Sequence, residues 1–321
     1  PEEYGGLGLG YVELSALMEI MGESLLCAPF LSSVVLGANL LLAAGDEAQR
    51  QAHLPEIAEG NLRAALAFAG TRGGLGPENV EPTVQRSKDR FVLNGQHSFV
   101  LDGHTAELLI VAARSPGSEK ADGISLFLVP GQTPGLERRA LATMDQTRRL
   151  ARVDLNSVEL PAEALLGEFE GGWKALEHGL RLAAVALAAE QVGGAQRCLD
   201  MSVAYALERQ QFGRPIGSFQ AIKHKCADML VAVESARSAA YYAACVANEQ
   251  SDELAACSSL AKAYCSDAYF QCAADAIQIH GGVGFTWEYD VHLHFKRARS
   301  SEQLLGDPVH HREQVAREIG L

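Results

Sequence analysis

The feature that most constrains the fold is a long C-terminal stretch with helical periodicity. After the glycine pair at 171–172 the composition shifts to Ala, Leu, Glu and Arg, with apolar residues at three- and four-residue spacing. Three segments carry this pattern: Trp173–Tyr205, Gly217–Asn248 and Glu253–His280. Pro215 and the Gly-rich run at 281–284 interrupt it, and a shorter helix is expected from Tyr289 to Leu305. These lengths predict a bundle of long antiparallel helices.

The part of the chain before residue 171 shows two different hydrophobic patterns. Residues 1–62 carry apolar residues at helical spacing, whereas from about Ala64 short apolar runs alternate with Gly, Pro, Asn and Asp. The runs are Phe91–Leu93, Leu108–Val111 and Ile124–Val129. We therefore expect a mostly α protein with a central β domain. The predicted domains are an N-terminal helical domain at 1–62, a middle β domain at 63–167 and a helical bundle at 168–321.

Charge and hydropathy exclude two classes of function. The 321 residues include 40 acidic and 27 basic side chains, a formal net charge of −13, so a nucleic-acid partner is not expected. The longest apolar run, near residues 180–192, is interrupted by Glu190 and is too short to span a membrane. Seven cysteines form no CxxC pair, which favours a reducing cytoplasm. Because the sequence opens on Pro1 rather than Met, we expect that N-terminal residues are missing from it.

Two common kinds of site are not predicted. The glycines at 281–284 follow a predicted helix rather than a strand, so they fail the structural test for a dinucleotide-binding fingerprint. The histidine pairs at 292/294 and 310/311 lack a Cys or carboxylate that would complete a metal ligand set. Any cofactor is therefore expected to be held in another way.

Three stretches together resemble the acyl-CoA dehydrogenase family. They are Pro1-Glu2-Glu3-Tyr4-Gly5-Gly6, the segment from Tyr205 to Ile216 that reads YALERQQFGRPI, and the segment from Gln278 to Phe285 that reads QIHGGVGF. The resemblance covers essentially the whole chain. It implies an N-terminal helical domain, a middle β-barrel-like domain and a C-terminal four-helix bundle, with FAD between the β domain and the bundle. It also implies that a neighbouring subunit completes the cofactor site, in a homo-oligomer or a hetero-oligomer built as a dimer of dimers.

The resemblance implies FAD contacts at five residues of the helical region. Arg209 and Phe212 match the family's RxxFG element, and an Arg fork with an aromatic ring suits an anionic, aromatic cofactor. Gln278, Gly281 and Gly282 match the element that approaches FAD phosphates through backbone N–H groups. The alternatives are a solvated cation at 209, a core residue at 212 and a helix C-cap at 281.

The middle domain departs from the family pattern at the expected flavin ring. The family's Thr-Glu-Pro-x-x-Gly-Ser-Asp segment corresponds here to residues 70–74, which read GTRGG. Its Trp-Ile-Thr segment corresponds to Phe99, Val100 and Leu101. Leu101 removes a hydroxyl that could bond the flavin, but backbone groups at 99–101 keep that capacity, so Phe99 and Leu101 are predicted cofactor contacts.

The reaction that the resemblance implies is α,β-dehydrogenation of an acyl-CoA thioester, with electrons passed to an electron-transferring flavoprotein. A carboxylate must remove the α-proton. At the two family positions for this base, however, the chain has Leu305 and Ala183. Glu190, two helical turns after Ala183, and Asp307 are the predicted catalytic residues. The alternatives are an ion pair or a substrate contact for Glu190 and a helix N-cap for Asp307. Glu302 is expected to be a solvated helix residue.

Arg181 is the candidate contact for coenzyme A, and its alternative is an i,i+4 surface pair with Glu177. Three functional hypotheses follow. The first is an active dehydrogenase whose base has moved, and the second is a non-catalytic or half-active subunit of a mixed assembly. The third, which ranks last, is a flavin-less binding scaffold.

Overall fold

The computed structural model describes all 321 residues, which divide into two units. The first unit contains Pro1–Leu9, Ala28–Thr143 and Arg148–Ala183. The second unit contains Gly10–Cys27, Met144–Thr147 and Ala184–Leu321. Each unit therefore takes in segments that are distant in sequence. The three domains at 1–62, 63–167 and 168–321 stay a prediction.

The first unit opens with short helices, as expected for the N-terminal residues. They are the 3₁₀ helix η1 (Glu2–Tyr4), the π-helix η2 (Leu31–Ala38), α2 (Asn39–Ala44) and α3 (Glu47–Ala58). A reciprocal pair of hydrogen bonds starts α3: the backbone N–H of Gln49 donates to Asp46 Oδ1 over 2.8 Å, and the backbone N–H of Asp46 donates to Gln49 Oε1 over 3.2 Å. Local sequence thus fixes where this helix begins.

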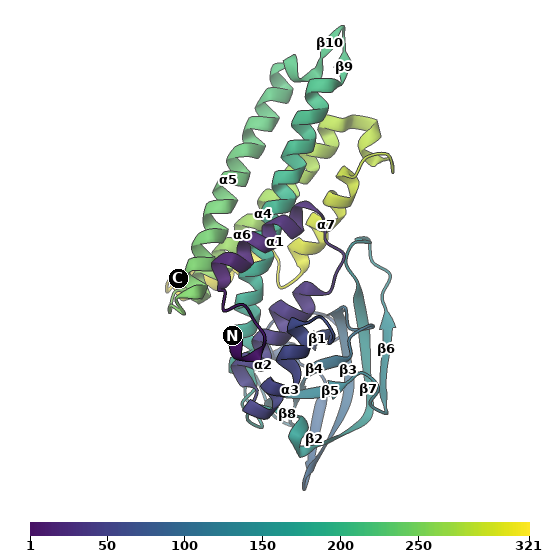
Figure 1. The fold of residues 1–321 in the computed structure, drawn as a ribbon, viewed down its shortest axis with the longest axis vertical. Helices are drawn as coiled ribbons and strands as arrows, with labels where there is room; N and C mark the ends of the chain where they lie inside the picture. The colour runs from purple at the N-terminus through teal and green to yellow at the C-terminus, as the bar shows by residue number, and fades with distance from the viewer. The chain divides into compact units, whose positions relative to one another are not determined.

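The sheet predicted for the middle of the chain is present in the first unit (Figure 1). Its strands are β1 (Ala64–Ala67), β2 (Thr83–Ser87), β3 (Arg90–Leu101), β4 (Leu108–Arg114), β5 (Ile124–Pro130), β6 (Leu136–Ala140), β7 (Leu150–Pro161) and β8 (Leu165–Leu166). Seven follow the order β6-β7-β3-β2-β4-β5-β8, and β1 pairs in parallel with β4. The short 3₁₀ helices η3 (Pro77–Asn79) and η4 (Ala162–Ala164) lie between strands.

The apolar runs recognised in the sequence form the interior of this sheet. Apart from their last residues, β4 and β5 are buried along their whole length. They pair antiparallel, with Ile110 opposite Leu128 and Val111 opposite Phe127. Continuous burial explains why these strands are uninterrupted apolar segments rather than alternating ones.

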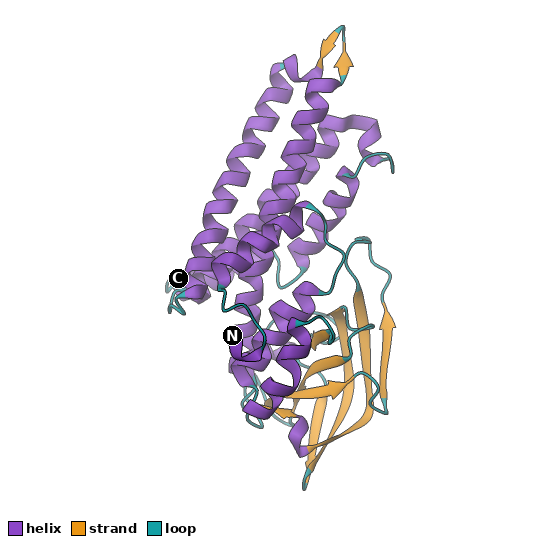
Figure 2. Cartoon of the chain, viewed as in Figure 1, coloured by secondary structure: helices purple, strands orange, loops and turns teal.

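The second unit contains the long helices, which Figure 2 shows in purple. They are α1 (Tyr11–Glu23), most of α4 (Trp173–Glu208), α5 (Gln220–Asn248), α6 (Leu254–His280), α7 (Val291–Gln303) and α8 (Pro308–Glu318). The helices expected at 173–205, 217–248, 253–280 and 289–305 are confirmed as α4 to α7, with shifted ends. α8 and the small hairpin of β9 (Gln210–Gln211) and β10 (Arg214–Pro215) were not expected. The 3₁₀ helices η5 (Ile216–Ser218) and η6 (Gly281–Phe285) precede α5 and follow α6.

Small side chains let these helices approach closely. Fully buried alanines line α5 and α6, including Ala236 and Ala240 on α5 and Ala261 and Ala276 on α6.

None of the helices is long and apolar enough to cross a membrane. Three cysteines, Cys198, Cys265 and Cys272, are buried, and all seven are free. The cytoplasmic location expected from cysteine usage stays a prediction.

Candidate active site

The segments expected to face the flavin ring lie in the first unit, at 70–74 and 99–101. Phe99 has a left-handed backbone with φ of 60°, and half of its surface is exposed. A Cβ placed on Gly73 would lie 3.8 Å from the Phe99 ring, so the two segments are in contact. Leu101, in contrast, is buried in the unit. The Phe99 ring and backbone groups are therefore available to a ligand, whereas the Leu101 side chain is not.

Arg209 and Phe212 lie at the tip where α4 ends. The hairpin pairs Gln211 with Arg214, and its turn is made by Phe212 and Gly213, with φ of 53° and 76°. This turn leaves Phe212 91% exposed, and the exposed Arg209 side chain makes no ion pair. The core position considered for Phe212 is not found, whereas the exposed Arg209 agrees with the solvated cation considered as its alternative. A cation and an aromatic ring are presented together, as binding of an anionic aromatic group requires.

Gln278 lies in the last turn of α6, and Gly281 and Gly282 directly follow that helix. Gly281 is the C-cap, with φ of 64°, so the expected capping role is confirmed. A Cβ on Gly282 would meet nothing within 4 Å, and its backbone is not left-handed. Nothing within this chain therefore requires glycine at 282. Close approach of another group to the backbone would require it, and exposed Gln278 lies beside that surface.

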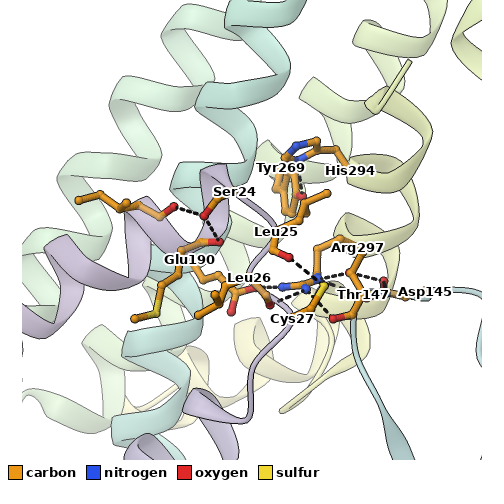
Figure 3. Close-up of polar contacts among 12 residues, drawn as sticks. Ser24, Leu25, Leu26, Cys27, Asp145, Thr147, Glu190, Tyr269, His294 and Arg297 are labelled. Carbon is orange, nitrogen blue, oxygen red and sulfur yellow. Dashed lines mark hydrogen bonds and ion pairs between the residues drawn. The ribbon is translucent and has the colours of Figure 1, made fainter. Parts of the chain in front are cut away.

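Glu190 lies on α4, buried in an ion pair with Arg297 of α7 (Figure 3). The Arg297 Nη1 group donates to Glu190 Oε1 over 2.8 Å, and Glu190 is only 6% exposed. A buried carboxylate is costly unless it is paired, and Arg297 supplies the opposite charge. The ion pair considered as its alternative role is therefore present, and its role as a catalytic base stays a prediction.

Arg297 also binds two other segments of the second unit. Its Nε donates to Thr147 Oγ1 over 2.8 Å and lies 3.4 Å from Asp145 Oδ2, while Nη2 donates to the carbonyls of Thr147 and Leu26 over 3.0 and 3.3 Å. Burial opposes the charge of Arg297, but the carboxylates of Glu190 and Asp145 more than offset it and raise the pKa of the guanidinium. We call Arg297, Glu190, Asp145 and Thr147 the Arg297 cluster.

Asp307 is engaged in secondary structure. Its Oδ1 accepts the backbone N–H of His310 over 2.7 Å, and Pro308 follows it as the first residue of α8. The N-cap considered for Asp307 is therefore present.

Glu302 was expected to be solvated, and this is wrong: its side chain is mostly buried and accepts a hydrogen bond from Arg299 Nη1 over 2.6 Å. Sequence spacing alone did not show that α7 turns this residue inward.

The turn that carries Leu305 is held at its backbone. His311 Nε2 bonds the Leu305 carbonyl over 2.7 Å, and Lys262 Nζ donates to the Gly306 carbonyl over 2.9 Å. Lys262 is fully buried on α6 and also donates to the carbonyl of Glu302, near the negative end of the α7 dipole. Leu305 itself is buried, with φ of 59°. Burial lowers the pKa of His311 to about 4.

Sequence reasoning missed Arg297 and Lys262, and it considered His311 only as a metal ligand. The one available signal was Lys262, a single cation within the apolar segment Leu260–Tyr264.

Arg181 lies 3.4 Å from Glu177, so the i,i+4 pair considered for it is present. Its contact with coenzyme A stays a prediction. No group of three or more His, Cys, Asp or Glu side chains is placed to hold a metal ion.

Family models match almost the whole chain. The N-terminal, middle and C-terminal domains of acyl-CoA dehydrogenase match residues 1–61, 65–157 and 170–320. The chain belongs to the acyl-CoA dehydrogenase family. Members of this family are FAD-dependent oxidoreductases, and the resemblance inferred from the three sequence stretches is confirmed.

Similar proteins extend over the full chain. Acyl-CoA dehydrogenase IpdE2 of Mycolicibacterium smegmatis is 36% identical over 318 residues, covering 99% of this chain and 81% of that protein. The structure of butyryl-CoA dehydrogenase from Megasphaera elsdenii matches with a TM-score of 0.94 and 27% identity, over 99% of this chain and 85% of that one. A glutaryl-coenzyme A dehydrogenase in complex with glutaryl-CoA also matches, with a TM-score of 0.94 and 27% identity, over 100% of this chain and 83% of that one.

The residues present fit the family's cofactor. The exposed ring of Phe212, the unpaired cation of Arg209 and the open backbone at Gly282 supply an aromatic surface, a positive charge and N–H donors. These are the groups that adenine and a pyrophosphate need. FAD supplies the hydride acceptor for the oxidation of the substrate.

Proposed function

We propose that this acyl-CoA dehydrogenase oxidises an acyl-CoA thioester between Cα and Cβ and passes the electrons to an electron-transferring flavoprotein. The proposal is carried by the exposed Phe212 and Arg209 at the end of α4, in a chain that matches all three domains of the family. A flavin-less scaffold would have no reason to keep a 91% exposed aromatic ring on a strained turn. The other proposed cofactor contacts are Gln278, Gly281, Gly282, Phe99 and backbone groups at Leu101.

Different residues of the chain would bind FAD and coenzyme A. Arg209 would bind a phosphate oxygen and Phe212 would stack on an aromatic ring, so both act in binding and orientation. Backbone N–H groups near Gly282 would add donors for the phosphates. Because the phosphates of coenzyme A are anionic and the chain is acidic, a local cation such as Arg181 would guide that end of the substrate. None of these residues removes the α-proton.

The identity of the base is the open step of this mechanism. Glu190 and Asp307 are the proposed bases, and each accepts a hydrogen bond from another group: Glu190 from Arg297 and Asp307 from the start of α8. To accept the α-proton, either carboxylate has to give up or share this bond. A desolvated carboxylate that accepts no such hydrogen bond would be a stronger base than Glu190 or Asp307.

These engaged carboxylates favour a second candidate function, that of a subunit in a mixed oligomer whose other chain supplies the base. Both family positions for the base carry buried aliphatic side chains, Leu305 and Ala183, that cannot accept a proton. In this arrangement the present chain would contribute helix packing and FAD contacts. A homo-oligomer is the corresponding proposal for the self-sufficient enzyme.

Anaerobic titration with saturated acyl-CoAs tests both candidates. Butyryl-CoA and glutaryl-CoA are suitable first members of the panel, because similar proteins are named for them. Loss of flavin absorbance near ~450 nm, the usual position of the oxidised flavin band, supports the self-sufficient enzyme, and Glu190→Gln and Asp307→Asn then identify the base. Bound flavin that no thioester bleaches, unless a homologous second chain is added, supports the mixed oligomer. Protein that takes up no FAD contradicts the proposed function.

A further inference from the structure

Strand β3 contains a bulge beside the exposed Phe99. In its antiparallel pairing with β7, His97 lies opposite Val153 and Val100 lies opposite Ala151. Two residues, 98 and 99, therefore face a single residue of β7. A bulge of this kind redirects a side chain, and here Phe99 is half exposed while both of its neighbours are buried.

The backbone is left-handed in the bulge and again directly after β3. Phe99 has φ of 60°, a region that a bulky aromatic residue rarely adopts, and Asp102 has φ of 54°. Such a conformation persists only where surrounding contacts over-determine it. The structure must therefore contain groups that hold residues 97–102 in place.

His97 holds one end of the bulge. Its side chain is fully buried, with Nδ1 3.0 Å from the carbonyl oxygen of Ala69 and Nε2 2.9 Å from that of Ala112. The backbone N–H of Ser98 donates to the same Ala69 carbonyl over 3.1 Å. His97 thus joins β3 to β4 and to the chain just before residues 70–74, which contact the Phe99 ring.

Ser32 and Asp102 hold the other end. The Ser32 hydroxyl donates to Asp102 Oδ2 over 2.7 Å, and the Asp102 N–H donates to the Arg149 carbonyl over 2.9 Å. Ser32 belongs to the π-helix η2 and is fully buried. The hydrogen bond therefore joins the π-helix η2 to the left-handed backbone at Asp102. Short π-helical turns are frequently found at functional sites.

We infer that His97 and the Ser32–Asp102 pair are positioning residues, which hold the β3 bulge so that the Phe99 ring and the 98–101 backbone face FAD. The inference rests on the proposed function, because it assigns these residues a role toward the same cofactor. They act through the backbone of the bulge and do not touch the reacting atoms. Their removal relaxes the strained turn and lets Phe99 fold back onto the sheet.

The test measures FAD binding and the flavin spectrum rather than turnover. Apoprotein variants His97→Phe, His97→Gln and Ser32→Ala are titrated with FAD, and His53→Gln, on α3 of the same unit, is the matched control. We expect His97→Phe to raise the Kd for FAD at least about tenfold, roughly the effect of one hydrogen bond to a buried group. His97→Gln keeps a donor for one carbonyl and shows a smaller increase, as does Ser32→Ala, and the visible band of the bound flavin shifts in all three.

The outcomes separate this inference from the proposed function. Wild-type apoprotein that binds no FAD contradicts the proposed function and the inference with it. Wild-type protein that binds FAD, together with variants whose Kd and spectrum are unchanged, overturns only the inference. If His97→Phe does not fold, Ser32→Ala and His97→Gln decide the question. A changed Kd in the His53→Gln control overturns it too, because the effect would not be specific to the bulge.

Discussion

Gly22 of α1 and Gly193 of α4 bring the two helices into main-chain contact. A Cβ on Gly22 would overlap the carbonyl oxygen of Glu190, and a Cβ on Gly193 would overlap that of Glu19. Each glycine therefore faces the backbone of the other helix. The contact lies on the turn of α4 that carries Glu190, so it fixes the backbone from which that carboxylate reaches Arg297.

Gly193→Ala should lower the free energy of unfolding by about 1–3 kcal/mol, because the backbone it would strike cannot move aside as a side chain can. Urea denaturation measures the effect. Gly282→Ala is the control, since a Cβ there meets nothing within 4 Å, and it should change stability by less than about 0.5 kcal/mol. Equal stability of the two variants would contradict the close helix contact.

Arg297→Met should be among the most destabilising single substitutions in the second unit. It removes the Arg297 cation from the buried carboxylates of Glu190 and Asp145, and breaking a buried ion pair typically costs about 3–5 kcal/mol. Glu190→Leu combined with Arg297→Met should cost less than the sum of the two single changes, as a double-mutant cycle would show. Additive effects would mean that the ion pair contributes nothing to stability.

The long helices and the sheet could be predicted because their patterns are local. Helical spacing of apolar residues located α4 to α7, and short apolar runs located β4 and β5. The helix α8 was missed because its sequence, PVHHREQVARE, is short and mostly polar. The Asp307-Pro308 start signal was visible, but a start signal alone does not predict a helix.

The candidate site was less predictable, because its contacts join distant parts of the sequence. Glu190 and Arg297 are 107 residues apart. Periodicity indicates that Glu190 lies on a buried face, but it does not indicate which cation meets it. Arg297 lies in the polar segment HFKRARS, where nothing local to the sequence distinguishes it from Lys296 and Arg299. Arg209 and Phe212, in contrast, were named from a motif that is contiguous in the sequence, and their contact with FAD stays a prediction.

Stability should fall as the pH is lowered toward 5, with a contribution from His294. Burial lowers the pKa of this histidine to about 3, whereas in the unfolded chain it titrates near ~6.5. The unfolded chain therefore binds the proton first. The contribution is fully present above about pH 6.5 and is lost between there and about pH 3, at up to about 1.4 kcal/mol per pH unit.

His294→Gln should flatten this dependence, because glutamine does not titrate. Its amide can still meet the Tyr269 hydroxyl, which lies 3.0 Å from Nδ1 of the histidine. Urea denaturation of both proteins near pH 7 and near pH 5 gives the comparison. Equal slopes would show that His294 is not held neutral in the folded protein.

Leu305→Glu tests whether the chain lacks only a base. The turn around Leu305 is held at the carbonyls of residues 305 and 306 by His311 and Lys262, so it does not depend on the leucine side chain. A glutamate in these buried surroundings would be desolvated, which strengthens it as a proton acceptor. In the mixed-oligomer candidate, butyryl-CoA should then bleach the bound flavin at least about 10²-fold faster than in the wild type.

Leu305→Gln is the matched control for Leu305→Glu, because it has the same shape and cannot act as a base. The two candidates predict different patterns across the set of variants. If Glu190 is the base, the wild type already bleaches, Glu190→Gln does not, and Leu305→Glu adds little. If the base comes from another chain, Leu305→Glu alone gains the reaction, while Glu190→Gln changes stability and not the rate of bleaching. Indistinguishable behaviour of Leu305→Glu and Leu305→Gln in a wild-type background that does not bleach would show that the turn at 305 is not where a base acts.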